Sequence, residues 1–147
     1  MINGKWQEIS FATSSPNAYA GNTGIEVTTL GQWGRIQLLA ESNFKFTTTG
    51  YESLSFAINI GAYEGEELYV GLIGSNGDVI AYKMVSPYTG SKTLDAYQWQ
   101  PVYVPLSDLG VSSTDVYGVE IQSSTPATFY VDEIQFLNTN GGSCNAE

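Results

Sequence analysis

The sequence has no histidine, and this absence excludes much of the chemistry that enzymes and metalloproteins use. Histidine is the commonest general base and the commonest protein ligand of transition metals. A Ser-His-Asp triad and a zinc site are therefore excluded by the residue inventory. The excess of carboxylates leaves the hard cation calcium as the metal to consider.

Basic residues are also scarce: five lysines and arginines face fifteen aspartates and glutamates, so the net charge is −10. Nothing here would neutralise phosphates, so we expect neither nucleic acid nor an anionic membrane surface as a partner. No apolar run approaches the ~18 residues of a membrane-spanning helix. No signal peptide follows Met1, and the strand-like start of the chain predicts a module cut from a longer protein. The single cysteine, Cys144, can form no internal disulfide, and we expect a free thiol.

What the chain does contain is polar but uncharged residues and aromatic rings. Charged residues make up only 14% of the chain, against roughly 25% in an average soluble protein. Ten tyrosines and three tryptophans are a heavy aromatic load for 147 residues. Sugar rings have apolar C–H faces and hydroxyl rims, which complement flat aromatic side chains that also carry a polar group. The composition therefore favours a surface that hydrogen-bonds to neutral polar partners.

Period-two segments rich in Val, Ile, Tyr, Phe and Thr recur along the chain, and no segment indicates a helix. We predict strands at 6–11, 24–29, 35–40, 53–60, 67–73, 78–85, 99–104, 117–122 and 128–136. The segment 74–77 (Gly-Ser-Asn-Gly) predicts a hairpin turn, since Asn-Gly suits positive φ. Nine short strands predict an all-β fold, a two-sheet antiparallel β-sandwich or jelly roll over 1–137. A polar tail or linker is expected at 138–147.

Alternation along the strands predicts a shared outer face with the residue types that a sugar site needs. Aromatic planes stack on pyranose rings, and planar polar groups bond to neighbouring hydroxyls. If the strands lie in one sheet, this face carries Trp33, Tyr69, Tyr82, Arg35, Gln37, Glu120 and Gln122. The simpler alternative is a solvated sheet face with tyrosines present for their β-propensity.

A second candidate surface lies on the predicted strand 99–104. Trp99 and Tyr103, with Tyr97 just before them, are spaced by two and four residues and would form a flat platform along the strand. Alternatively, Trp99 packs under a loop at the edge of the sandwich. Tyr88 lies in a loop that would reach either surface or neither.

Asp132 interrupts an apolar run, which predicts a half-buried carboxylate that needs a cation or several donors. Calcium, with Glu8 as a second ligand, is one solution. A set of backbone hydrogen bonds is the other.

Four segments in this order resemble the β-sandwich carbohydrate-binding modules appended to bacterial cellulases and related glycoside hydrolases: 33–38 (WGRIQL), 50–56 (GYESLSF), 99–106 (WQPVYVPL) and 129–134 (FYVDEI). The resemblance implies a jelly-roll sandwich that binds β-glucan or hemicellulose. It also implies a structural calcium involving Asp132, and ligand contacts on the strands of Trp33, Tyr82 and Glu120.

We therefore predict a secreted, monomeric, non-catalytic module that binds β-1,4 or mixed-linkage glucan, with xyloglucan as a further candidate, and that targets a covalently linked catalytic domain. One alternative is an adhesin or structural sandwich domain without affinity for sugar. The other is a small jelly-roll glycosidase that uses Glu120, although the second carboxylate of a retaining enzyme is not evident.

Overall fold

The computed structural model describes residues 24–29, 33–39, 45–62, 67–112 and 114–138, together with the backbone of the strands at 2–5, 9–15 and 143–145. These residues form thirteen strands and one short 3₁₀ helix, η1 (Ser86–Tyr88). The all-β class and the antiparallel sandwich predicted from the sequence are confirmed. Within the described part, no helix has the length and apolar character that crossing a lipid bilayer requires.

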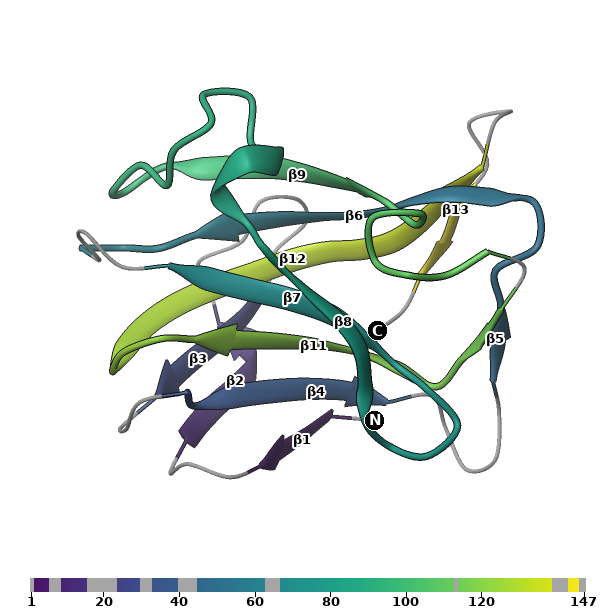
Figure 1. Cartoon of the computed structure of the whole chain (residues 1–147). Helices are drawn as coiled ribbons and strands as arrows, with labels where there is room; N and C mark the ends of the chain where they lie inside the picture. The colour runs from purple at the N-terminus through teal and green to yellow at the C-terminus, as the bar shows by residue number, and fades with distance from the viewer. Residues whose placement is uncertain are drawn as a thin grey trace.

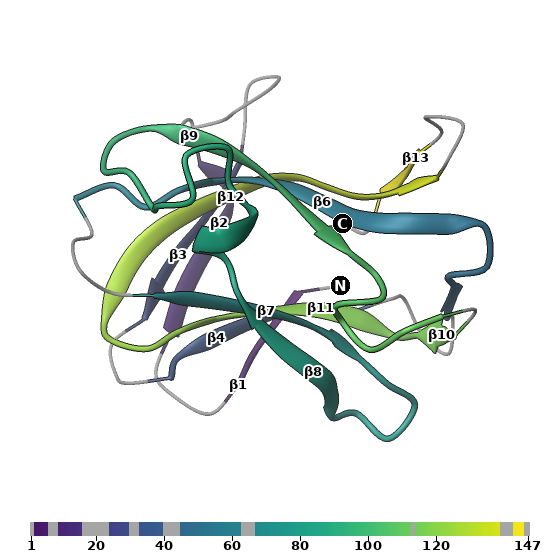
Figure 2. The same cartoon turned by 45° about the horizontal axis from the view of Figure 1, so that its top comes forward.

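Two antiparallel sheets face each other (Figure 1), and Figure 2 separates the two layers. Sheet A has the order β1 (Ile2–Lys5), β4 (Arg35–Leu39), β11 (Gly118–Ser123), β7 (Leu68–Ile73) and β8 (Val79–Met84). Sheet B has the order β2 (Ile9–Ser15), β3 (Gly24–Thr29), β12 (Ala127–Asn138), β6 (Tyr51–Asn59) and β9 (Trp99–Pro105). A small third sheet pairs β5 (Phe46–Thr47) with β10 (Asp115–Val116).

The core lies between the two sheets and is built by the alternation that the sequence shows. Successive side chains of a strand point to opposite faces, and burial of the apolar set drives the sheets together. Sheet A contributes Ile36, Leu38, Leu68, Val70, Leu72, Val119 and Ile121, and sheet B contributes Leu54, Phe56, Ile58, Val102, Val104, Phe129, Val131, Ile134 and Phe136, all buried.

The predicted strand positions agree with the structure within one or two residues for β3, β4, β6, β7, β8, β9, β11 and β12. The prediction 6–11 overlaps β2, and its residues 6–8 lie outside the described part. Strands β1, β5, β10 and β13 (Ser143–Asn145) were missed; they have only two to four residues, too few to show a period. Strand β13 pairs with β12, so part of the segment expected as a tail adds to sheet B.

The predicted hairpin turn between β7 and β8 is confirmed. Gly74 N–H donates to the carbonyl of Asp78 at 2.9 Å, and Gly77 has a φ of 84°. The Asn76 side chain closes the turn, because its Oδ1 accepts from the Asp78 N–H at 3.1 Å. Next to the turn Ile73 pairs with Val79, and a register shift between Gly71 and Ile73 then places Gly71 opposite Tyr82 and Tyr69 opposite Met84.

Candidate functional site

The outer face of sheet A brings the predicted polar and aromatic residues together. Two rows of residues run across its strands. One row pairs Gln37, Glu120, Gly71 and Tyr82 in turn, and the other pairs Arg35, Gln122, Tyr69 and Met84. Six of the seven predicted residues occupy these rows, and Trp33 lies two residues before the start of β4. We call this surface the sheet A face.

Glu120 is the centre of this face and is fully buried, with 0% of its surface exposed. Its Oε1 accepts from Gln37 Nε2 at 2.7 Å, and Gln37 is itself only 2% exposed. Its Oε2 accepts from the Tyr82 hydroxyl and from Arg35 Nη1 at 3.4 Å. A buried carboxylate is tolerated when it is paired and hydrogen-bonded, and these three donors meet that requirement.

The same network fixes Tyr82, whose ring is 40% exposed. Partial burial, and then the hydrogen bond to Glu120, raises the pKa of the Tyr82 phenol from its ordinary 10.0 to about 12. Arg35 Nη1 also donates to the Tyr82 hydroxyl at 3.3 Å. The phenol is therefore protonated throughout the neutral range, and its ring is held in one orientation at the surface.

Gly71 lets β8 approach the sheet closely enough for this contact. A Cβ at Gly71 would lie 2.3 Å from Val79 Cγ1 and 2.7 Å from the carbonyl oxygen of Ala81. The pairing of β7 with β8 also shifts register between Gly71 and Ile73. Any larger residue would push β8 away and move Tyr82 off Glu120.

Trp33 reaches the same face from the turn before β4. It has a positive φ of 63°, which is uncommon for a bulky residue, and its ring is 47% exposed. The Trp33 and Tyr69 ring centroids lie 5.6 Å apart at a tilt of 51°. This contact joins the tryptophan to Tyr69, which belongs to one of the two polar rows.

Sequence reasoning missed Met84, which is exposed on the sheet A face beside Tyr69. The signal was available, because Met84 has the same parity as Tyr82 in β8. A flexible thioether here extends the apolar part of the face.

The second predicted surface lies on the outer face of sheet B. Trp99 and Tyr103 point to the same side of β9, where Trp99 is half-buried and Tyr103 is 55% exposed. Tyr88 belongs to neither surface: it packs partly against the core, and its hydroxyl donates to Asp108 Oδ2 at 2.8 Å.

Asp132 is buried at a bulge of β12, where the register with β6 shifts between Asp132 and Gln135. Glu133, the next residue, has a φ of 56°, and its N–H donates to Asp132 Oδ1 at 2.8 Å. Glu8, the predicted second calcium ligand, lies outside the described residues. Among those that are described, no cluster of three or more His, Cys, Asp or Glu side chains occurs. Calcium takes six to eight oxygen ligands, which include backbone carbonyls as well as carboxylates, so calcium at Asp132 stays a prediction.

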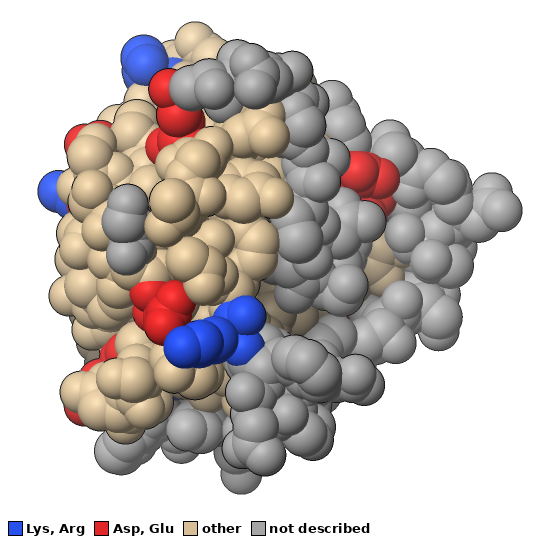
Figure 3. Space-filling view, turned by 90° about the vertical axis from the view of Figure 1, so that its right-hand side faces the viewer, with Lys and Arg blue, Asp and Glu red and all other residues tan. Residues whose placement is uncertain are grey.

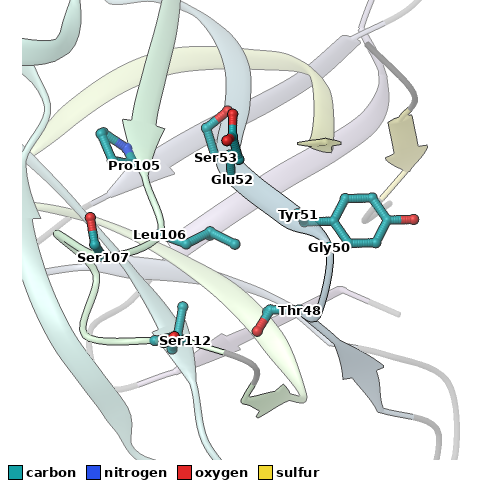
Figure 4. Close-up of a pocket in the computed structure, with 10 residues that line it drawn as sticks. Thr48, Gly50, Tyr51, Glu52, Ser53, Pro105, Leu106, Ser107 and Ser112 are labelled. Atoms are coloured by element: carbon teal, nitrogen blue, oxygen red, sulfur yellow. The ribbon is translucent and has the colours of Figure 1, made fainter. Parts of the chain in front are cut away.

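A hollow of about 510 Å³ opens at one end of the sandwich, between residues 48–53 and 105–112 (Figure 4). Figure 3 shows this end, where the described surface is mostly uncharged. Tyr51 points away from Ser107 and Ser112, and its ring packs on Phe46 with 4.9 Å between centroids.

No protein-family model matches this chain, and no curated protein sequence matches it. Solved structures are similar in fold. A family 11 carbohydrate-binding module from Clostridium thermocellum, in complex with a β-1,3-1,4-mixed-linked tetrasaccharide, superposes with a TM-score of 0.60 at 11% identity, over 94% of this chain and 88% of the module. The CBM22-1–GH10 modules of xylanase 10B from the same organism, in complex with xylohexaose, give 0.62 at 15% identity, over 94% of this chain and 26% of that chain.

A β-1,2-glucanase from Parabacteroides distasonis superposes with a TM-score of 0.68 at 15% identity, over 94% of this chain. This chain spans 23% of the length of that enzyme. The structural neighbours are mainly carbohydrate-binding modules with a β-sandwich fold. The fold implied by the sequence resemblance is thus confirmed.

Proposed function

We propose that this protein is a non-catalytic carbohydrate-binding module that holds a β-1,4 or mixed-linkage β-glucan chain on the sheet A face. The observation that carries the proposal is the pair of half-exposed rings, Trp33 and Tyr82, on a face whose polar groups are fixed by the buried Glu120. Rings held in place lose little conformational entropy when a ligand binds, so their contact area contributes to affinity.

The residues around the two rings have the hydrogen-bonding groups that sugar hydroxyls require. Arg35 and Gln122 are partly exposed in one row of the face, and they provide planar groups that bond to neighbouring hydroxyls. Arg35 is paired with Glu120, so the face presents little free charge to a neutral ligand. The mixed-linkage tetrasaccharide bound by the similar family 11 module supports glucan as the ligand class, with xyloglucan as a further candidate.

The surroundings of Glu120 favour binding over hydrolysis. A retaining glycosidase needs two carboxyl groups about 5–5.5 Å apart in a cleft. On the described strands of sheet A, the outward positions beside Glu120 carry Gln37 and Gly71, and no second carboxylate occupies either row. Glu120 is also covered and engaged by three donors, which leaves it no access to a glycosidic bond.

In the parent protein we propose that the module is secreted, acts as a monomer, and keeps a linked glycoside hydrolase on plant cell-wall polysaccharide. The similar CBM22-1–GH10 modules of xylanase 10B show this kind of linkage.

Affinity electrophoresis against cellulose derivatives, mixed-linkage glucan, xyloglucan, xylan and mannan, with a reducing-sugar assay in parallel, tests the proposal. We expect retardation by glucans without release of sugar. Release of sugar would establish a glycosidase. If the protein is neither retarded nor releases sugar, sugar binding is rejected and the adhesin or structural domain is favoured.

Variants locate the site. The double variant Trp33→Ala, Tyr82→Ala removes both stacking planes, and we expect the affinity of the sheet A face for glucan to fall by about tenfold to a hundredfold. Tyr82→Phe is the matched control, because it keeps the ring and removes only the hydroxyl. An unchanged affinity in the double variant would reject the sheet A face as a site.

A further inference from the structure

The outer face of sheet B contains a trough that follows β6. The outward residues of this strand are small, namely Ser53, Ser55, Ala57 and Asn59, and Gly61 follows them. The strands on either side carry larger outward residues. The pairings give three rows across the trough: Tyr103–Ser55–Gln135, Pro101–Ala57–Asp132 and Trp99–Asn59–Tyr130.

Two hollows lie one after the other along this trough. The first, of about 210 Å³, has Ser55 and Ala57 as its floor, with Tyr103 on one side and Gln135 on the other. The second, of about 390 Å³, is lined by Asn59 and Gly61, by the aromatic residues Tyr97 and Tyr130, and by Thr128. Tyr97 is 75% exposed, so an aromatic plane is available at each hollow.

The floor of the trough contains polar groups. Ser55 is only 6% exposed and Asn59 only 7%, yet both line the hollows. Asn59 Oδ1 accepts from the Gly61 N–H at 2.9 Å, so the Asn59 amide donor is left to face the trough. Among the described residues, the fully buried side-chain polar atoms without a partner are Arg35 Nε and Gln37 Oε1, and neither the Ser55 hydroxyl nor the Asn59 Nδ2 belongs to this set. Both groups can therefore bond to a ligand hydroxyl in the trough.

We infer that this trough is a second saccharide site, on the opposite side of the sandwich from the sheet A face. Its ligand class is a neutral β-linked oligosaccharide, which rests on the proposed function. One sugar ring stacks on Tyr103, and its hydroxyls bond to Ser55 and Gln135. A further sugar lies at the second hollow, where Asn59 donates to it beside Tyr97.

The length of the trough favours an oligosaccharide over a monosaccharide as the ligand. The first and third rows are four residues apart along β6, which is ~13 Å at the rise of a strand. Because the two faces belong to different layers of the sandwich, one protein would hold two glucan chains at once. Such a module would bridge neighbouring chains of a polysaccharide and gain avidity from the second contact.

A nuclear magnetic resonance titration with cellohexaose separates the two faces. The side-chain amide signals of Asn59 and Gln135 report on the trough, and that of Gln122 reports on the sheet A face. We expect all three to shift. Tyr103→Ala, at an exposed position, should weaken the response of Asn59 and Gln135 by about tenfold while Gln122 responds as in the wild type. Tyr103→Phe keeps the plane and is expected to behave as the wild type does.

The outcomes are distinct. If the amide signal of Gln122 shifts and those of Asn59 and Gln135 do not, the second site is wrong and the proposed function stands. Shifts of Asn59 and Gln135 without Gln122 would support the trough and reject the sheet A face. If Tyr103→Ala leaves the response of Asn59 and Gln135 unchanged, the stacking role of Tyr103 and this site are both wrong. The melting temperature of each variant checks that the fold is intact.

Discussion

Replacing Glu120 is the sharpest test of how the sheet A face is held together. Glu120→Ala removes the acceptor of three donors at once, and one of them, the Gln37 amide, is almost fully buried. A buried donor left without its partner costs ~1–3 kcal/mol, and breaking a buried ion pair costs ~3–5 kcal/mol. Because the Arg35 side chain is 17% exposed and its contact is long, at 3.4 Å, we expect about 3 kcal/mol in total.

Glu120→Gln is the matched variant and should be milder. The Oε1 of Gln37 is buried without a partner in the described structure. Rotation of the Gln37 amide would let this oxygen accept from the new amide, whose own oxygen still accepts from Tyr82. Only the charge-assisted part of the network is then lost, about 1 kcal/mol.

Urea unfolding followed by fluorescence measures both variants. The alanine variant should also melt roughly 6–12 °C lower, given ~2–4 °C per kcal/mol for a domain of this size. A loss below about 1 kcal/mol for Glu120→Ala, or equal losses for the two variants, would refute the view that this network is buried and well satisfied.

Three further predictions concern the same fold. Spectrophotometric titration at 295 nm should show one tyrosine with a pKa near 12 that is absent from Tyr82→Phe. Since the pKa of this phenol is raised in the folded state, the stability that it contributes is complete below pH about 10 and is lost as the pH rises through about 12. The wild type should therefore lose more stability than Tyr82→Phe over this pH range, and equal losses would contradict the prediction. Gly71→Ala should destabilise the protein by about 1–3 kcal/mol, because its Cβ meets the backbone of Ala81, and it should also weaken glucan binding. A variant with the stability and the glucan affinity of the wild type would show that β8 moves to accommodate the methyl group. Calcium at Asp132 stays a prediction from the sequence: chelation with EGTA should lower the melting temperature of the wild type but not that of Asp132→Asn, and melting curves unaffected by EGTA would remove the metal.

The sequence by itself determined the strands of the sandwich and the face on which each side chain lies. Both follow from a period of two and from apolar burial, which are local properties of the chain. Alternation alone put Gln37, Glu120 and Tyr82 on the outward side of their strands, as the structure has them. The Asn-Gly sequence likewise predicted the turn between β7 and β8 through chemistry within a few residues, whereas the register shift between Gly71 and Ile73 has no such local signal.

Only the tertiary structure decided which strands are neighbours, and the character of the site depends on this. Glu120 and Gln37 are 83 positions apart in sequence, and they meet because β11 lies between β4 and β7. No local pattern shows that an outward carboxylate becomes fully buried beneath Tyr82, or that the small residues of β6 become the floor of a trough between β9 and β12. Strand order is set by the sum of long-range contacts over the whole chain, so the periodicity of single strands predicts the faces but not what gathers on them.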